Sequence, residues 1–177
     1  MKILVTYKSK TDFTKSYAEM IAKEVECQLV DFKKVTVEMM SDYDVVVFGG
    51  GLLAGMVNGL KNAKAMFEKS LAKKLVVFAT GATPNNATEM IDGVWESNLS
   101  SEELATVPHF YMQSGICYEK MSFLNRTLMK IGASMLSKKQ DKDGFDEGFE
   151  QALKGSHDIS SKEYAEPIIK YLLEEKA

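Results

Sequence analysis

Short apolar runs alternate along this chain with longer stretches in which apolar residues recur every three or four positions. The short runs predict strands at residues 2–7, 27–32, 43–50, 74–80 and 106–112. The periodic stretches predict helices near residues 13–26, 60–71, 86–104, 120–138 and 161–175. Ser100 and Glu103 have the spacing of a capping box, and Pro167 must either kink the last helix or mark its start.

Two of the strands have a composition typical of strands that are buried on both faces. "YDVVVFGG" and "KLVVFAT" each contain an unbroken apolar run, where a half-exposed strand would alternate apolar and polar residues. Strands that alternate with helices indicate a parallel sheet with helices on both faces. We therefore expect an α/β fold, a doubly wound five-stranded parallel sheet, in a single domain over residues 1–177.

Composition narrows the classes of function. The chain has 177 residues, 45% of them hydrophobic, which is enough for a sizeable core. A net charge of −3 argues against a nucleic-acid-binding protein, which would concentrate basic residues on one face. The longest uncharged stretch, residues 45–60, is shorter than a membrane span and contains five glycines. Cys27 and Cys117 have no metal-binding or redox spacing, so we expect reduced thiols in a cytoplasmic protein.

Candidate chemistry begins directly after the first strand. Ser9, Thr11 and Thr14 lie where strand becomes helix, and a helix N-terminus offers free backbone N–H groups to an anion. One hydroxyl is explained as a helix cap. Three exceed what a cap needs and favour a phosphate held in a neutral cradle. Other phosphate loops do not fit, because the chain has no G-x-x-x-x-G-K-[ST], and its G-x-G-x-x-A match follows the third strand without a later ribose-binding acid.

Two further loops follow the third and fourth strands. "GGGLLAGMVNGL" is glycine-rich and uncharged, and the side chains of Leu52, Leu53 and Met56 can pack against one face of a flat ring. A buried strand-to-helix turn explains the same segment equally well. "ATGATPNNAT" is small and polar, so its backbone can hydrogen-bond the edge of a planar heterocycle. Ligands of open α/β sheets lie beyond the carboxyl ends of the strands. Together the three loops predict a site for a monophosphate that carries a large neutral ring.

At this point the chain resembles the flavodoxin-like family. The family's phosphate pattern [ST]-x-T-G-x-[ST] appears as "SKTDFT", with aspartate in place of the usual glycine. The resemblance implies that the cofactor is FMN and that two loops without aromatic residues flank the flavin. The implied cofactor-binding residues are Ser9, Lys10, Thr11, Asp12, Phe13, Thr14, Gly51, Leu52, Leu53, Ala54, Gly55, Met56, Thr80, Gly81, Ala82 and Thr83.

The second half resembles the flavodoxin-domain subgroup that includes flavodoxin-type protoporphyrinogen oxidases. That subgroup has a Gly…Tyr turn after the fifth strand, which Gly115 and Tyr118 match, followed by a basic amphipathic helix. The resemblance implies that Tyr118 reaches the flavin. The helix predicted from Lys120 to Lys138 is best explained as an ordinary core-facing helix with a solvated rim, and the alternative is that it lies on an anionic membrane surface or beneath a partner.

The main hypothesis is an FMN-binding redox protein in which the flavin supplies the chemistry, so no catalytic side chain and no metal ligand is assigned. In one form of this hypothesis the protein is an oxidoreductase that acts on a porphyrinogen or a quinone. In the other it is an electron-shuttle flavodoxin that serves a protein partner or a small-molecule electron acceptor. A flavin-free binding module of the same fold is a third alternative, which Asp12 keeps open. A receiver-type signalling domain is disfavoured, because "TYK" ends the first strand where an acidic pair would be needed.

Overall fold

The computed structural model describes residues 1–120 and 156–176, which cluster into two compact units. The first unit contains Met1–Ser114 and Ser160–Ala177, and the second contains Gly115–Ile159. In the second unit, the described residues include a short 3-10 helix, η2 (Tyr118–Lys120), and a bridge between Ile116 and His157. The helix predicted at 120–138 lies outside the described residues apart from its first position. The single domain over residues 1–177 stays a prediction.

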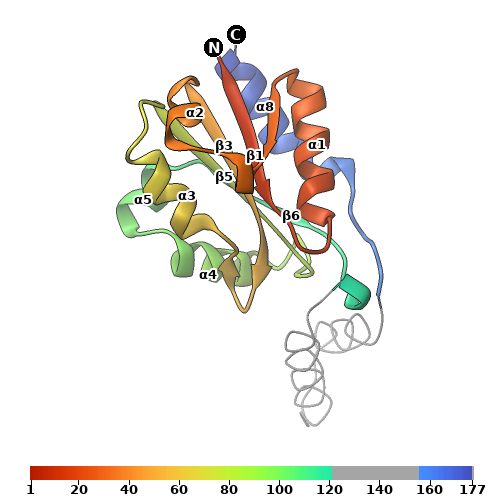
Figure 1. Cartoon of the computed structure of the whole chain (residues 1–177). Coiled ribbons are helices and arrows are strands. Elements are labelled where there is room, and N and C mark those ends of the chain that lie inside the picture. Colours follow the sequence, from red (N-terminus) through yellow and green to blue (C-terminus); the bar gives the residue numbers. More distant parts are fainter. Residues whose placement is uncertain (121–155, 177) are drawn as a thin grey trace, which may run out of the picture. The chain divides into compact units, whose positions relative to one another are not determined.

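The first unit is built on a doubly wound sheet (Figure 1). Five strands are parallel in the order β2-β1-β3-β5-β6, so the chain winds outward from β1 in both directions. Their bounds are β1 (Ile3–Lys8), β2 (Gln28–Asp31), β3 (Val45–Leu53), β5 (Lys74–Gly81) and β6 (His109–Gln113). The predicted α/β fold is confirmed, with one correction. The sheet has six strands, because the two-residue β4 (Met56–Val57) pairs antiparallel with β3.

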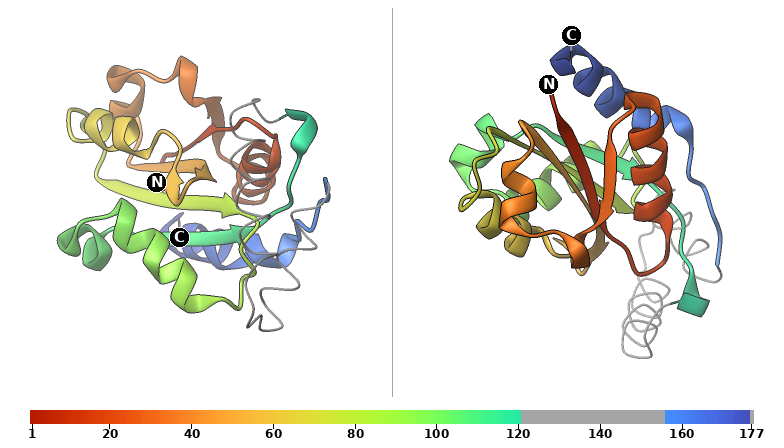
Figure 2. Two further views of the ribbon diagram at one scale, coloured as in Figure 1. Left: turned by 90° about the horizontal axis from the view of Figure 1, so that it is seen from below. Right: turned by 45° about the horizontal axis from the view of Figure 1, so that its top comes forward.

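Helices cover both faces of this sheet, as Figure 2 shows. Two pack on one face, α1 (Phe13–Val25) and α8 (Lys162–Lys176). The other face carries α2 (Val37–Ser41), α3 (Leu60–Phe67), α4 (Thr88–Asn98) and α5 (Ser101–Thr106). The helix predicted at 86–104 is therefore two helices, and the predicted capping box of Ser100 and Glu103 starts the second. Pro167 lies inside α8 and does not mark its start.

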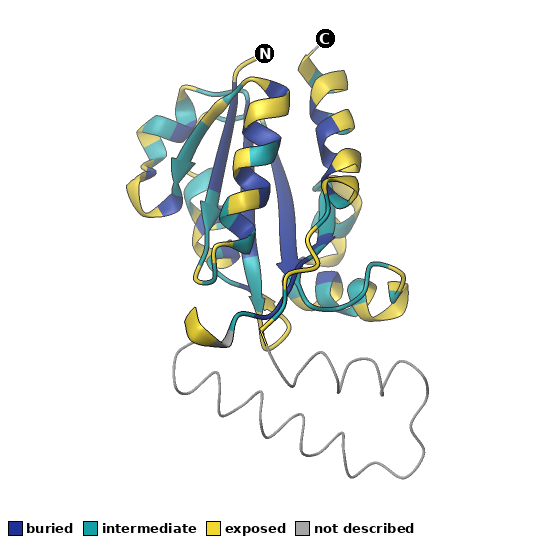
Figure 3. Ribbon diagram, turned by 90° about the vertical axis from the view of Figure 1, so that its right-hand side faces the viewer, coloured by how far each residue is buried: buried dark blue, intermediate teal, exposed yellow. Residues whose placement is uncertain are grey.

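The alternation of side chains along the strands divides the apolar residues into two cores. Ile3 and Val5 face α1 and α8, whereas Leu4 between them belongs to the core under α2, α3 and α4. Figure 3 shows the same division as buried strands between helices whose outer faces are exposed. The ring of Phe78 on β5 lies over Gly49 on β3, so a Cβ built on Gly49 would lie 2.0 Å from Cζ of Phe78. Any larger residue at Gly49 would have to displace that ring.

A buried phenol ties the end of the sheet to the last helix. Tyr17 on α1 is 1% exposed, and its hydroxyl donates to the carbonyl of Gln113 at 2.6 Å. The same oxygen accepts the backbone N–H of Ser161 at 3.1 Å, just before α8 begins. At the other end of α8, Lys176 Nζ donates to the carbonyl of Val25 at 2.8 Å. Both described chain ends therefore lie at the amino end of the sheet (Figure 1). Among the described residues, no helix is long and apolar enough to span a bilayer.

Tyr17→Phe tests this anchor. We expect the free energy of unfolding to fall by about 1–3 kcal/mol, because the substitution leaves a buried carbonyl and a backbone N–H without their partner. Urea denaturation measures the change. Tyr164→Phe is the matched control, since the Tyr164 hydroxyl makes no hydrogen bond to the described residues. An equal loss in both variants would contradict the role of Tyr17.

Candidate functional site

The loops after β1, β3 and β5 meet at the carboxyl end of the sheet. Thr14 in the first turn of α1 and Thr80 near the end of β5 are both almost fully buried, and their hydroxyl oxygens are 2.8 Å apart. Gly51 is paired with Thr80 in the sheet, and a Cβ built on Gly51 would lie 3.3 Å from Oγ1 of Thr14. The structure thus brings together one predicted residue from each of the three loops.

The loop from β1 to α1 has the features of an anion site. The Oγ atom of Ser9 is buried and has no hydrogen-bond partner among the described residues. A buried hydroxyl without a partner is costly unless a ligand satisfies it. Helix α1 starts at Phe13 with no acidic side chain in its first turn and no side-chain capping bond from Asp12. Its first N–H groups and the positive end of its dipole therefore favour a negative charge beside Ser9.

Asp12, which stands where the phosphate-loop pattern has glycine, has a left-handed backbone conformation. Its φ is 68° and its ψ is −13°, in the left-handed region. Aspartate enters this region more readily than most residues, so the departure from the sequence pattern changes charge more than backbone geometry. Lys10 beside it is exposed, while Thr11 and Phe13 are half-buried. The predicted phosphate loop therefore forms with aspartate at the position where the pattern has glycine.

The glycine-rich segment is a strand that ends in a tight hairpin, not a strand-to-helix turn. Strand β3 continues to Leu53, and Leu53 pairs with Met56 in β4. The two residues between them, Ala54 and Gly55, have φ values of 49° and 78°, the positive values that a type I′ turn requires. Leu53 is 39% exposed and Met56 is 52% exposed. These two side chains are available to a ligand at the tip of the hairpin.

Leu52, the third predicted apolar residue, lies differently. Its side chain packs with the core under α3 and α4, and its Cδ1 atom would lie 2.9 Å from a Cβ built on Gly81. Leu52 therefore fixes β3 against the end of β5. Only Leu53 and Met56 remain as candidates for direct contact with a ring.

Asn98, at the end of α4, clamps the hairpin. Its Oδ1 atom accepts the N–H of Val57 at 2.8 Å, and its Nδ2 atom donates to the carbonyls of Gly55 at 2.8 Å and Val94 at 2.7 Å. Sequence reasoning missed this residue. An asparagine near the end of a predicted helix gives no sign that its amide bonds to a segment 41 residues away.

The loop after β5 is held by β6. The Tyr111 hydroxyl donates to the carbonyl of Thr83 at 2.9 Å, and the N–H of Ser114 donates to the carbonyl of Gly81 at 2.7 Å. Asn85 and Gln113 exchange two bonds between side chain and backbone, at 2.9 and 3.1 Å. Burial raises the pKa of Tyr111 above its usual range, so its phenol remains a donor. The sequence did not indicate this second set of supporting residues, because their partners are backbone groups.

Two predicted site residues lie in the other compact unit. Gly115 is buried, and a Cβ built on it would clash with the carbonyl oxygen of His157. Tyr118 begins η2. Their role at the flavin stays a prediction. Within residues 1–120 and 156–176, no three His, Cys, Asp or Glu side chains gather to hold a metal ion.

Comparison with known proteins identifies the family. The family model of the flavodoxin domain matches residues 4–143, well over half of the 177 residues. The chain therefore belongs to the flavodoxin domain family, a class of doubly wound α/β proteins. A search of the curated proteins gives no match.

Several solved structures are similar. An archaeal flavodoxin is 19% identical, with 64% of this chain and 85% of that chain covered and a TM-score of 0.42. Flavodoxin 1 from Bacillus cereus is 12% identical, with 79% and 100% covered and a TM-score of 0.44. A flavoprotein from Lactobacillus acidophilus in complex with FMN is 15% identical, with 63% and 92% covered and a TM-score of 0.43. All three TM-scores are below 0.5.

Asn98→Ala tests the hairpin clamp. We expect a loss of about 2–3 kcal/mol in the free energy of unfolding, because the buried N–H of Val57 loses its acceptor. Hydrogen exchange at Val57 should also accelerate. Ser97→Ala is the control, since it removes only an exposed bond to the carbonyl of Gly93. Unchanged exchange at Val57 in the Asn98 variant would show that β3 alone holds the hairpin.

Proposed function

We propose that this protein binds FMN at the carboxyl end of the sheet and acts as a redox protein. The observation that carries the proposal is the buried, unpartnered hydroxyl of Ser9 beside the uncapped N-terminus of α1. A phosphate placed there would accept from Ser9 and from backbone N–H groups of the first turn. The proposal also rests on membership of the flavodoxin domain family.

In this proposal the phosphate is held by Ser9, Thr11, Thr14 and the amides from Lys10 to Thr14. Thr14 bonds to Thr80, and a hydroxyl can donate and accept at once, so this contact leaves bonding capacity for a phosphate oxygen. Gly51 leaves open the space next to the two hydroxyls, which a side chain would crowd. The residues present therefore fit a monophosphate.

The ring would lie between the β3–β4 hairpin and the loop after β5. Bound FMN supplies one-electron and two-electron transfer through its ring system. Leu53 and Met56 would cover the ring and exclude water from one face, while Asn98 holds their hairpin in place. Backbone groups of Thr80, Gly81, Ala82 and Thr83 would bond to its polar edge. The sequence resemblance adds Tyr118 and Gly115 to this proposal.

The substrate or partner is a finer proposal. An oxidoreductase acting on a porphyrinogen or a quinone, in the cytoplasm or at a membrane surface, is supported by the resemblance around Gly115 and Tyr118. An electron-shuttle flavodoxin serving a protein is the alternative. The apolar tip formed by Leu53 and Met56 suits either a flat apolar substrate or a docking surface. Assays with porphyrinogen and quinone substrates distinguish these two options once the flavin is established.

A visible absorbance spectrum, with and without added FMN, tests the proposal directly. We expect a yellow protein that releases FMN on heating, or a spectral shift when FMN is titrated into colourless protein. A protein that stays colourless and shows no shift would instead be a flavin-free binding module of the same fold.

Thr11→Leu tests the phosphate loop. We expect the dissociation constant of FMN to rise by at least about tenfold, roughly 1.4 kcal/mol, because a bulky apolar side chain would replace a hydroxyl beside the phosphate. Fluorescence titration of FMN measures this change. Thr106→Leu, an exposed site on α5, should leave the affinity unchanged. Equal affinity in both variants would exclude the role given to Thr11.

Asp12→Gly tests the departure from the family pattern. Removing a negative charge from the phosphate loop should lower the FMN dissociation constant about threefold to tenfold. Glu26→Gly is a matched control, because Glu26 also has a positive φ, 50°, but lies at the other end of α1. Glycine relieves backbone strain at both positions, whereas only the Asp12 variant should bind FMN more tightly. Tighter binding in both variants would assign the effect to helix stability.

A further inference from the structure

Five exposed or half-buried lysines lie at the end of β1, in the loop after it, in η1 (Phe32–Lys34) and at the start of α3. We call them the lysine shoulder, and they are Lys8, Lys10, Lys33, Lys34 and Lys61. None of the five forms an ion pair with the residues that the structure describes. Elsewhere in the described chain six lysines are paired with carboxylates, for example Lys64 with Glu103 at 2.7 Å and Lys73 with Asp44 at 2.8 Å.

The parallel strands place all five lysines at the carboxyl end of the sheet, because the segments that carry them end or follow β1, β2 and β3. The rings of Phe32 and Phe48 pack edge to face with centroids 5.0 Å apart, which fixes η1 against β3. Cζ of Phe48 lies 3.2 Å from a Cβ built on Gly59, and Cδ of Lys8 lies 2.6 Å from the same point. Gly59 is the N-cap of α3, so Lys8 packs against the start of this helix, and Lys61 lies in its first turn.

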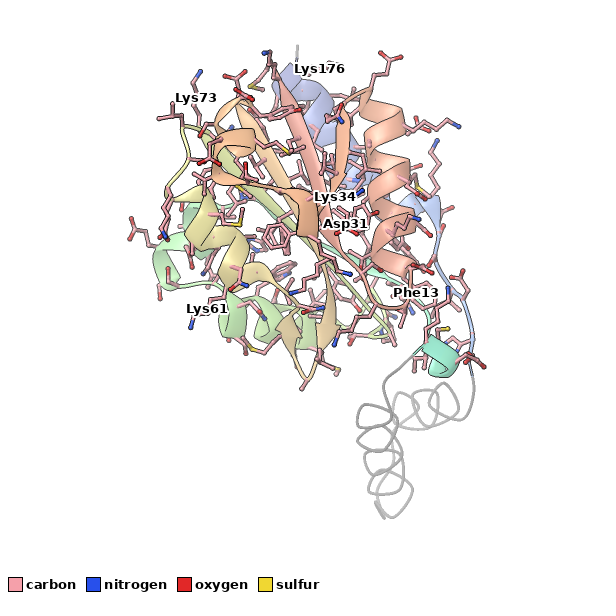
Figure 4. All side chains as sticks on the ribbon, in the orientation of Figure 1. Phe13, Asp31, Lys34, Lys61, Lys73 and Lys176 are labelled. Atoms are coloured by element: carbon pink, nitrogen blue, oxygen red, sulfur yellow. The ribbon has the colours of Figure 1, made fainter. Side chains whose placement is uncertain are left out.

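Acidic residues also lie in these segments. Asp31 accepts the backbone N–H of Lys33 at 2.9 Å, and Asp12 lies on the exposed surface of the phosphate loop. Figure 4 labels Lys34 near Asp31 and places Lys61 at the end of the molecule opposite Lys73 and Lys176. The net charge of the whole chain is −3, so this concentration of lysines runs against the overall composition.

The placement of Lys61 adds a second argument. A cation in the first turn of a helix is disfavoured by the helix dipole, and several like charges without counter-charges repel one another. No acidic residue occupies the first turn of α3. Such an arrangement costs stability in the isolated protein, and an anionic partner would offset that cost.

We infer that the lysine shoulder is a docking surface for an acidic protein. The surface adjoins the β3–β4 hairpin, because a Cβ built on Gly50, the sheet partner of Lys8, would touch Val57 in β4 and Asn58 directly after it. A partner docked there reaches the exposed Leu53 and Met56. That this contact serves electron exchange rests on the proposed function; the docking itself does not. Complementary charge would steer the partner to the site and make association dependent on salt.

Binding of a fluorescein-labelled aspartate-rich peptide, followed by fluorescence anisotropy, tests the surface on flavin-free protein. We expect binding at low salt that weakens as salt rises. Reversing Lys33 and Lys34 together (K33E and K34E) should weaken binding by about tenfold or more. The matched control reverses Lys23 and Lys69 (K23E and K69E), which changes net charge equally. Both control residues are exposed and lie away from the site, Lys23 in the last turn of α1 and Lys69 two residues after the end of α3.

Equal weakening in the two double variants would overturn the inference, because net charge alone would then explain binding. Preference for a lysine-rich peptide, absence of binding, or binding only to anionic lipid vesicles would overturn it as well. Urea denaturation of both variants checks that each is folded. A separate FMN titration distinguishes the two proposals. Loss of FMN binding with intact peptide discrimination removes the proposed function alone, and the reverse result removes this inference alone.

Discussion

The buried hydrogen bond between Thr14 and Thr80 is the contact on which the arrangement of the candidate site depends. It joins the first turn of α1 to the end of β5 across β3, which passes between them at Gly51. A hydroxyl pair of this kind is satisfied within the protein, so the two elements are held together before any ligand arrives. The loops that begin at these points therefore start from fixed positions, and binding would not have to pay the full entropy of ordering them.

Unusual backbone conformations occur in two loops of the candidate site. Of the three non-glycine residues with positive φ in the described chain, Asp12 and Ala54 belong to the candidate site, and Glu26 ends α1 at the far side of the molecule. Each of the two site residues lies in a short loop. The hairpin that contains Ala54 is held in place by hydrogen bonds from the side chain of Asn98. Strain of this kind is characteristic of functional sites, where the surrounding structure determines an unfavourable conformation.

The fold could be predicted from the sequence because buried parallel strands have a distinctive composition. The runs around Val45–Phe48 and Leu75–Ala79 are apolar without interruption and rich in valine, which is typical of short strands covered on both faces. The short elements α2 and β4 were not predicted, because five and two residues are too few to show a periodic pattern. The polar residues of the phosphate loop could also be recognised, since their chemistry is local. The supporting residues Asn85, Asn98 and Tyr111 could not, because they bond to backbone groups that come near only after the sheet has formed.

The position of the chain ends has a practical consequence for any measurement on a surface. Residue 1 and the end of α8 both lie at the amino end of the sheet, while the three loops of the candidate site lie at its carboxyl end (Figure 1). A linker attached at residue 1 or after α8 would thus hold the protein at the end of the sheet opposite these loops. A layer tethered to an electrode in this way would present the hairpin and the lysine shoulder to the solution, so the orientation of the sample would be set by the fold.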